Sequence, residues 1–381
     1  MTGGRPVYLD YNATTPLDPR VGEVMRAAMD LFGNPSSGHV YGREARAVLD
    51  RARAEVAGLL GCSPPEIVFT SGGTESDNHA IKGAAWARAD RGRHLVVSAV
   101  EHPAVQRPAA WLAARGWEVS TVGVDRDGRV DPADVARAVR PDTALVSVMH
   151  ANTEVGALQP VAAIAHAARA AGALVHTDAA QTAGKVAVRV GELDVDLLSL
   201  AGHKLYGPKG IGALYVRGGV TLESLSHGAG HELGRRAGTE SVMLAAGLGE
   251  AARLAAEQLG EELPRLTKLR DRLEAALCAA VTDAVVHARL AERLPNTLSI
   301  GFPGARADRL LARLEGVACS AGAACHAGGT EVSAVLAAMD APREAALGTL
   351  RFSVGRFSTR EDIDRAVPLI LSAVAGARQV P

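Results

Sequence analysis

Short apolar runs alternate with segments of helical periodicity through the first two thirds of the chain. The stretches between the runs predict helices over Val40–Leu60, Glu75–Asp90, Ala104–Arg115, Pro132–Val139 and Val161–Ala171. Near-continuous apolar strands that alternate with helices are typical of an α/β fold with a mostly parallel sheet covered on both faces. The runs predict seven buried strands: Ile67–Thr70, Leu95–Ser98, Glu118–Val122, Ala144–Met149, Leu174–Thr177, Leu197–Leu200 and Ala213–Val216.

The pattern changes after about Thr239. Ala/Leu/Glu-rich segments predict two long helices, and a smaller α+β domain follows them. We therefore expect a large domain over residues 16–250 and a small domain made of residues 1–15 and 251–381. The expected elements of this second part are helices Val242–Leu259, Glu262–Val281, Ala307–Leu314 and Arg360–Val374, and strands Thr297–Ile300 and Leu350–Val354.

Composition narrows the class of protein. The 381 residues are 48% hydrophobic and 22% charged, with a net charge of −1, which is typical of a globular protein and favours neither nucleic acid nor an anionic membrane surface as partner. No apolar run approaches the ~20 residues of a membrane span, and the N-terminus lacks a signal core. We expect a cytoplasmic protein. The widely spaced Cys62, Cys278, Cys319 and Cys325 form neither a disulfide framework nor a paired zinc pattern.

Polar groups follow the predicted strands, where ligands of such sheets bind. Ser71–Asn78 places small residues and hydroxyls at the start of a helix. Its free N–H groups suit a phosphate, although plain helix capping explains the same residues. His102 follows the next strand, and it is either a residue that stacks on a ring or moves a proton, or a structural histidine. Asn152 lies in a polar loop after the strand Ala144–Met149.

Two charged residues complete this series. Asp178 follows the strand Leu174–Thr177, where a buried carboxylate is costly unless it is paired. A pyridinium N–H would pair with it, and a helix N-cap is the alternative. Lys204 follows the strand Leu197–Leu200 and is one of only five lysines in an arginine-rich chain. Desolvation lowers the pKa of a lysine and makes its amine a nucleophile, whereas a guanidinium does not form an imine under ordinary conditions.

The order of these groups is more specific than any one of them. A loop suited to phosphate, a histidine, a carboxylate and a lysine follow successive strands. Pyridoxal phosphate needs its phosphate bound, its ring nitrogen protonated beside a carboxylate and its aldehyde held by a lysine. The sequence therefore predicts pyridoxal 5'-phosphate as the cofactor.

The chain resembles the cysteine desulfurases and the closely related selenocysteine lyases, in the fold-type I, class V aminotransferase group. The matching segments occur in family order over nearly the whole length. The resemblance implies a large domain with a mostly parallel seven-stranded sheet and a smaller α+β C-terminal domain. The segments are Tyr8–Pro16, Gly33–Ser37, Phe69–Asn78, Glu101–His102, Asn152–Gly156, His176–Gln181, His203–Gly212, Arg235–Glu240, Ser320–Cys325 and Arg351–Arg356.

The resemblance also implies roles at the reacting end of the cofactor. Lys204 would hold the aldehyde as a Schiff base and move the α-proton. His102 would stack on the ring and assist proton transfer, and Asp178 would pair with the pyridinium nitrogen. Arg351 would take the substrate carboxylate, for which a bidentate guanidinium is the best partner.

The remaining implied contacts surround the cofactor. Gln181, with Asn152 nearby, would contact the phenolate oxygen and the substrate side. Thr239 would reach the phosphate of a neighbouring subunit, which implies a homodimer. The phosphate ligands of the same subunit would be Gly73, Thr74 and His203.

Cys325 is the sulfur acceptor implied by the resemblance. Its neighbours, Ser320–Gly329, are mostly small, which suits a thiolate that enters the site, takes a sulfur atom and leaves as a persulfide. The other three cysteines lie in apolar or helical context and are expected to be inert.

Three positions depart from the family pattern. Ala201 stands where the family often has a phosphate-binding hydroxyl, so Ser199 or backbone N–H groups would have to replace it. His231 stands where glutamine is common. The segment Gly322–His326 is closer to that of selenocysteine lyases and their bacterial relatives than to that of housekeeping desulfurases.

The sequence thus predicts a homodimer that converts L-cysteine to L-alanine and passes the sulfur to a protein such as an iron–sulfur scaffold, for iron–sulfur cluster or thio-cofactor assembly. A selenocysteine lyase acting on L-selenocysteine is the nearest alternative. Another class V aminotransferase and a non-catalytic homologue remain open.

Overall fold

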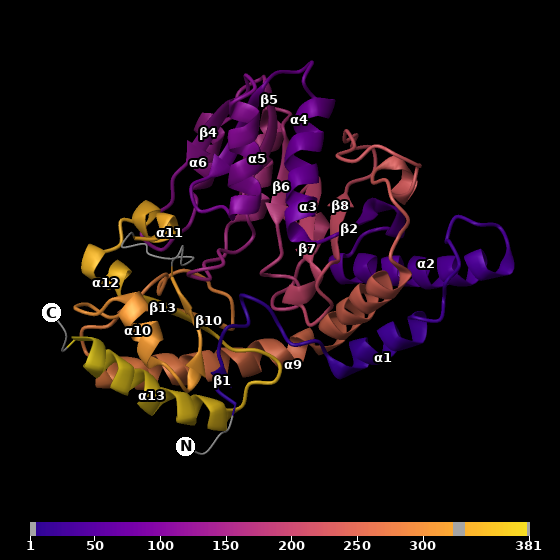
Figure 1. Cartoon of the computed structure of the whole chain (residues 1–381). Helices are drawn as coiled ribbons and strands as arrows, with labels where there is room; N and C mark the ends of the chain where they lie inside the picture. The colour runs from indigo at the N-terminus through magenta and orange to yellow at the C-terminus, as the bar shows by residue number, and fades with distance from the viewer. Residues whose placement is uncertain (1–4, 323–331, 379–381) are drawn as a thin grey trace.

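The computed structural model describes residues 5–322 and 332–378, and a seven-stranded sheet forms its largest layer (Figure 1). The strand order is β2-β8-β7-β6-β5-β3-β4; β3 to β7 run parallel, and β8 runs antiparallel to both β2 and β7. The mostly parallel sheet is therefore confirmed. The strands are β2 (Ile67–Thr70), β3 (His94–Ser98), β4 (Glu118–Val122), β5 (Thr143–Ser147), β6 (Leu174–Asp178), β7 (Leu197–Ala201) and β8 (Gly212–Val216).

Helices cover both faces of this sheet, and each face has its own apolar cluster. On one face pack α2, α6, α7 and the first half of α9; on the other pack α4 and α5. Alternating strand and helix segments in the sequence lead to this layering because each strand buries both faces. The helices before β8 are α1 (Pro19–Ala28), α2 (Val40–Leu60), α3 (Gly73–Asn78), α4 (Ala84–Ala87), α5 (Pro103–Ala113), α6 (Pro132–Ala138), α7 (Val161–Ala170) and α8 (Val190–Leu193), with a 3-10 turn at Pro64–Glu66.

The helix predicted over Glu75–Asp90 is not a single α-helix. A π-helical turn, His79–Gly83, separates α3 from α4. The backbone carbonyl of Gly83 accepts a hydrogen bond at 3.1 Å from the backbone N–H of Glu223, in the loop after β8. Apolar periodicity alone gives no sign of such a turn, since the π-helical turn and α4 bury their apolar residues in the same cluster.

The two helices predicted over Val242–Leu259 and Glu262–Val281 are one helix, α9 (Val242–Ala280), which passes through Pro264. Proline inside a helix costs about 3 kcal/mol, but packing on both sides of it outweighs that cost. The first half contacts α1 and α2, and the second half contacts α13. Figure 1 shows α9 extending from below the sheet to the orange and yellow C-terminal part.

The C-terminal part is built on a four-stranded sheet of order β12-β13-β10-β9, beside the two-stranded pair β1-β11. Its apolar cluster joins the second half of α9 to β10, β13 and α13. Because α9 runs through residue 250, the predicted domain boundary stays a prediction. The strands and helices of this part are β1 (Val7–Tyr8), β9 (Val285–Val286), β10 (Thr297–Gly301), β11 (Val317–Ala318), β12 (Ser320–Ala321), β13 (Thr349–Ser353), α10 (Ala307–Arg313), α11 (Ala334–Ala338), α12 (Arg343–Leu347) and α13 (Arg360–Arg378). Two 3-10 turns, Gly202–Lys204 and Glu232–Gly234, lie between β7 and α9.

The segment after β1 joins the two parts. Asp10 forms a parallel bridge with Ser353 at the end of β13, and the Thr15 backbone N–H donates to the carbonyl of His203 at 3.0 Å. Residues 10–15 therefore lie between the carboxyl end of β7 and the small sheet. Among the described helices, none has the length and apolar run needed to cross a membrane.

Candidate active site

A cavity of about 580 Å³ opens where the large sheet meets the C-terminal part. The carboxyl ends of β6 and β7, the first residues of α3 and α5, the segment after β1 and strands β12 and β13 line it. Eight of the predicted site residues lie on its wall: Gly73, Thr74, His102, Asp178, Gln181, His203, Lys204 and Arg351.

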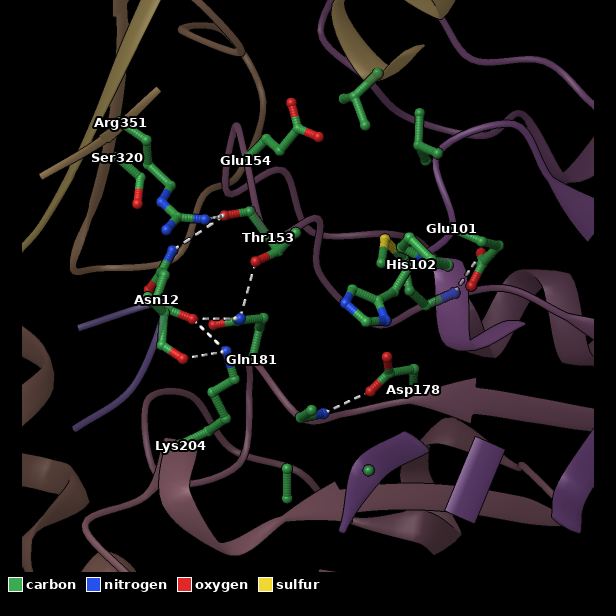
Figure 2. Close-up of a pocket in the computed structure, with 18 of the residues that line it drawn as sticks. Asn12, Glu101, His102, Thr153, Glu154, Asp178, Gln181, Lys204, Ser320 and Arg351 are labelled. Atoms are coloured by element: carbon green, nitrogen blue, oxygen red, sulfur yellow. Dashed lines mark hydrogen bonds between the residues drawn. The ribbon is translucent and has the colours of Figure 1, made fainter. Parts of the chain in front are cut away.

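Lys204 ends the 3-10 turn that follows β7, so its amine points away from the sheet into the cavity (Figure 2). Its Nζ atom donates to the backbone carbonyl of Asn12 and, at 2.9 Å, to that of Ala13. Burial, together with the positive charge of Arg351, lowers the pKa of Lys204 to about 8. A substantial fraction of the amine is therefore neutral near physiological pH, as a nucleophile requires.

Asp178, the last residue of β6, and His102, the N-cap of α5, face each other across the cavity (Figure 2). One oxygen of Asp178 accepts from the backbone N–H of Ala180 at 2.8 Å, and the other faces the cavity. Burial raises the pKa of Asp178, while His102 and Lys204 oppose the rise. Burial lowers the pKa of His102, and its Nδ1 accepts from the Ala104 N–H at 3.1 Å, so the neutral ring carries its proton on Nε2.

The start of α3 forms the end of the cavity predicted to bind phosphate. Gly73 lies against β7: a Cβ atom there would come within 3.3 Å of the Ala201 Cβ. His203 Nδ1 lies 3.0 Å from Thr14 Oγ1, and burial lowers the pKa of His203 to about 4, so this ring is also neutral. Its contribution to an anion site is hydrogen bonding rather than charge.

Ser199 does not replace the hydroxyl missing at Ala201. The Ser199 hydroxyl lies 2.9 Å from His176 Nε2 and is fully buried behind the cavity. The groups left for a phosphate on this wall are the Thr74 hydroxyl, His203 and the free N–H groups at the start of α3. The second departure, His231, lies outside the cavity wall and pairs with Glu240 at 2.9 Å. The third departure, in the segment Gly322–His326, lies outside the described residues after Gly322.

Arg351 is on β13, at the opposite end of the cavity from Asp178 (Figure 2). Its Nη2 forms an ion pair with Asp10 at 2.8 Å, and its Nη1 donates to the Thr153 carbonyl at 3.1 Å. Its Nε has no partner within residues 5–322 and 332–378. Ser320 Oγ donates to the same carboxylate of Asp10 at 2.9 Å. The guanidinium is thus held in place, with one of its edges already occupied by a protein carboxylate.

Three other predicted residues are not on this wall. Asn152 is buried behind it, where its Oδ1 accepts from two backbone N–H groups and its Nδ2 donates to the Val100 carbonyl at 3.1 Å; its contact with substrate stays a prediction. Thr239 is exposed on the segment before α9. Cys325 lies outside the described residues, but Ser320, Ala321 and Gly322 before it line the cavity.

Sequence reasoning missed several groups at this site. Asn12 and Thr153 connect the two walls by hydrogen bonds, and Asp77 and Glu101 are buried acids on the cavity wall. All four lie inside segments that carried the family resemblance, but no role had been assigned to them. Cys319 was expected to be buried; it is half-buried and lines the cavity, and burial raises the pKa of its thiol to about 12.

The donor set fits pyridoxal phosphate. An amine of lowered pKa, a carboxylate oxygen and a neutral imidazole converge on one space, and the unpaired buried Oδ1 of Asp77 and Oε2 of Glu101 lie beside it. A metal site is not suggested: the described residues contain no cluster of three or more His, Cys, Asp or Glu side chains suited to an ion.

Comparisons with known proteins identify the family. Residues 7–366 match the family model Aminotransferase class-V. Cysteine desulfurase IscS of Dictyoglomus turgidum is 43% identical over 99% of this chain and 96% of its own length. The Escherichia coli enzyme of the same name is 43% identical over 98% of this chain and 94% of its own.

Solved structures give the same result. A NifS-like protein superposes with a TM-score of 0.91 at 38% identity and covers 97% of this chain and 100% of its own. A structure described as SspA in complex with cysteine superposes with a TM-score of 0.82 at 34% identity, over 92% of this chain and 99% of its own. The chain therefore belongs to the class-V aminotransferase family and, within it, to the cysteine desulfurases, which depend on pyridoxal phosphate.

Proposed function

We propose that this cavity binds pyridoxal phosphate, that the enzyme converts L-cysteine to L-alanine, and that Cys325 receives the sulfur as a persulfide. The observation that carries the proposal is the convergence of Lys204, Asp178 and His102 on one cavity. The relatives named cysteine desulfurase, and the related structure that contains cysteine, support the choice of substrate.

The sheet side of the cavity would hold the cofactor. Lys204 would hold its aldehyde carbon, Asp178 its ring nitrogen and His102 one ring face, with Thr74 and His203 at the phosphate. When bound, pyridoxal phosphate supplies an electron sink for the bonds at the substrate α-carbon. The Lys204 amine, once free, is the base that removes the α-proton, since its lowered pKa leaves it partly neutral at the working pH.

The substrate carboxylate would bind Arg351. The guanidinium is bonded to Asp10 and Thr153, so the incoming carboxylate would exchange with Asp10 or use the unpaired Nε edge. Glu154 also lines this end, and burial raises its pKa to about 7. A partly neutral Glu154 weakens repulsion of the substrate carboxylate.

The sulfur step belongs to Cys325. Its thiolate attacks the substrate sulfur, a sulfur–sulfur bond forms, and the electron pair of the carbon–sulfur bond stays with the substrate carbon, which takes up a proton to give alanine. A sulfur-acceptor protein, such as an iron–sulfur scaffold, would then receive the sulfur. We place the enzyme in the cytoplasm, because a thiol that cycles through a persulfide needs a reducing compartment.

We also propose a homodimer. Phe32 is 79% exposed and stacks on Tyr41 with ring centroids 4.9 Å apart, and Leu233 is 67% exposed. Exposed aromatic and aliphatic groups after α1, on α2 and in the loop before α9 suit a second copy of the chain. Thr239 lies six residues after Leu233 and would then reach the phosphate of the neighbouring subunit.

Paired assays test this function. The wild type and Cys325→Ala are supplied with L-cysteine or L-selenocysteine in the presence of a thiol reductant, and alanine, sulfide and selenide are measured. We expect alanine and sulfide from wild type and no cysteine turnover by Cys325→Ala, with Cys62→Ala as the matched control. Full cysteine turnover by Cys325→Ala would remove the persulfide step. Turnover of selenocysteine alone would indicate a lyase instead.

Borohydride reduction tests the role of Lys204 separately. We expect reduction to trap the cofactor on wild-type protein as a covalent adduct at Lys204, and we expect no adduct on Lys204→Ala. An adduct that persists in Lys204→Ala would show that another amine holds the cofactor.

A further inference from the structure

Asp77 is a buried acid for which the proposed function has no role. It lies on α3, near the residues at the phosphate end, and is 1% exposed. It borders the cavity together with Asp178, and its Oδ1 atom has no hydrogen-bond partner among the residues that the structure describes. An ionised carboxylate with an unpaired, buried oxygen is costly, whereas a neutral acid is much less so.

A neutral histidine, His176, lies beside Asp77. His176 Nε2 lies 3.6 Å from Asp77 Oδ1. The same nitrogen lies 2.9 Å from Ser199 Oγ, and Nδ1 lies 2.8 Å from Ser147 Oγ. The ring is completely buried, and burial lowers the pKa of His176 to about 3. His176 therefore gives Asp77 a neutral polar neighbour, just beyond hydrogen-bond distance, and no counter-charge.

The other titratable groups that face Asp77 are acids. His176 and Asp178 are two residues apart on β6, so their side chains share the face that α3 covers. Glu101, in the loop before α5, is the third buried acid, and its Oε2 has no partner in the described part of the chain. Burial and the charges of Asp178 and Glu101 raise the pKa of Asp77 well above its ordinary value. Among the described residues, Asp77 has no ion pair with an arginine or lysine.

We propose that Asp77 is a positioning residue: it stays a neutral carboxylic acid beside the neutral His176 and thereby leaves Asp178 as the ionised carboxylate that faces the cofactor ring. The inference rests on the proposed function, because it assigns Asp178 to the ring nitrogen. An ionised Asp77 would repel the charge on Asp178 and favour a proton on that carboxyl group, which would then lose its attraction for a protonated ring.

Two variants of Asp77 separate its neutral form from its charged form. Asp77→Asn is always neutral and keeps a hydrogen-bond donor, whereas Asp77→Leu keeps neither donor nor acceptor. The cofactor-loaded enzymes are titrated by visible absorbance between pH 5 and 9, and kcat and KM for L-cysteine are measured. For Asp77→Asn we expect the absorbance midpoint to move by less than about 0.3 pH unit and kcat to fall less than about threefold. Asp77→Leu should lose kcat about tenfold, because an apolar side chain then replaces the polar neighbour of His176 and Asp178.

The protein without cofactor gives an independent measurement. Above pH ~4 the unfolded chain loses the Asp77 proton and the folded chain keeps it, so wild-type stability falls as the pH rises toward the folded-state pKa. Asp77→Asn has no proton to lose at this position, so it lacks this fall in stability. Its thermal midpoint should therefore gain on that of the wild type between pH 5 and 8, whereas the exposed control Asp50→Asn should keep a constant offset.

The outcomes separate this inference from the proposed function. Wild-type protein that binds no cofactor, or cofactor that Lys204→Ala still holds covalently, would overturn the proposed function. If wild type is loaded as expected, the inference is overturned by a shift of about one pH unit or more in Asp77→Asn, by an Asp77→Leu enzyme that equals wild type, or by a constant stability offset of Asp77→Asn at all pH values.

Discussion

The two walls of the cavity hold their polar groups in different ways. On the wall formed by the large sheet (the sheet wall), Asp178 and Lys204 have shifted pKa values, and one oxygen of Asp178 faces the cavity with no partner among the described residues. The opposite wall is formed by the segment after β1 and by strands β12 and β13. On this wall, Arg351 already bonds to Asp10 and Thr153. The sheet wall is thus suited to a group that stays bound through many turnovers. The opposite wall is suited to a ligand that exchanges with a protein carboxylate in each turnover.

Removal of Asp178 tests the sheet wall and should have the largest effect. Asp178→Ala removes the carboxylate that would hold the ring nitrogen protonated, so we expect kcat for L-cysteine to fall by about 10²–10³-fold, the scale on which preorganised electrostatic groups act. The visible absorbance of the bound cofactor should also change its pH dependence. The surface residue Asp308, paired with Arg306, provides the control Asp308→Ala. Equal kcat in Asp178→Ala and wild type would contradict the contrast between the walls.

Removal of Arg351 tests the opposite wall. Arg351→Leu removes a charge-assisted, bidentate partner of the substrate carboxylate, and we expect kcat/KM for L-cysteine to fall about 100-fold. Most of this loss should appear in KM, while the cofactor absorbance stays that of wild type. Arg306→Leu, at an exposed ion pair, is the matched control. A changed cofactor spectrum with unchanged KM would place Arg351 on the cofactor instead.

The sheet wall was largely predictable from sequence, and the opposite wall was not. His102, Asp178 and Lys204 each follow a short apolar strand, and strands of one parallel sheet end at the same edge, so their meeting follows from local pattern. Arg351 meets Asp10 only because β13 bridges a segment from the other end of the chain. A contact between residues so far apart in the sequence cannot be predicted from local periodicity. Family resemblance alone suggested a role for Arg351.

The sequence also did not predict the direction in which individual side chains are buried. The segment Ser71–Asn78 predicted a phosphate site or a cap, but not that Asp77 turns inward toward β6. The hydroxyl of Ser199 was expected as a possible substitute at the phosphate, and its strand position instead turns it toward His176. A strand places alternate residues on opposite faces, but which face meets the cavity depends on packing against α3. Likewise, the sequence predicted two helices where α9 is continuous, because its contacts on both sides of Pro264 outweigh the cost of that proline.

Lys185 connects the walls and provides a prediction of intermediate size. Its buried Nζ donates to Gln181 Oε1 at 3.0 Å, and Gln181 Nε2 donates to the Asn12 carbonyl and to Thr153 Oγ1. Burial lowers the pKa of Lys185 well below its ordinary value. Lys185→Met keeps the length of the side chain and releases one end of Gln181, so we expect kcat/KM to fall about tenfold, the scale of one buried hydrogen bond. The control is Lys82→Met, because the Lys82 side chain lies over Trp111, away from the cavity. Equal losses in the two variants would assign the effect to general stability.

Substitution of Asp10 should have the smallest effect, and its sign is the informative part. Asp10→Asn keeps an oxygen for Arg351 and for Ser320 but removes the negative charge that competes with the substrate carboxylate. The ion pair is mostly buried, with side chains 9% and 17% exposed, but the asparagine oxygen would still accept from Arg351, so we expect the substitution to change substrate binding by about 1 kcal/mol or less. We therefore expect KM for L-cysteine to decrease by about threefold with kcat nearly unchanged. A tenfold rise in KM would mean that Asp10 positions the guanidinium for substrate rather than competing with it, and the opposite wall would then be as preorganised as the sheet wall.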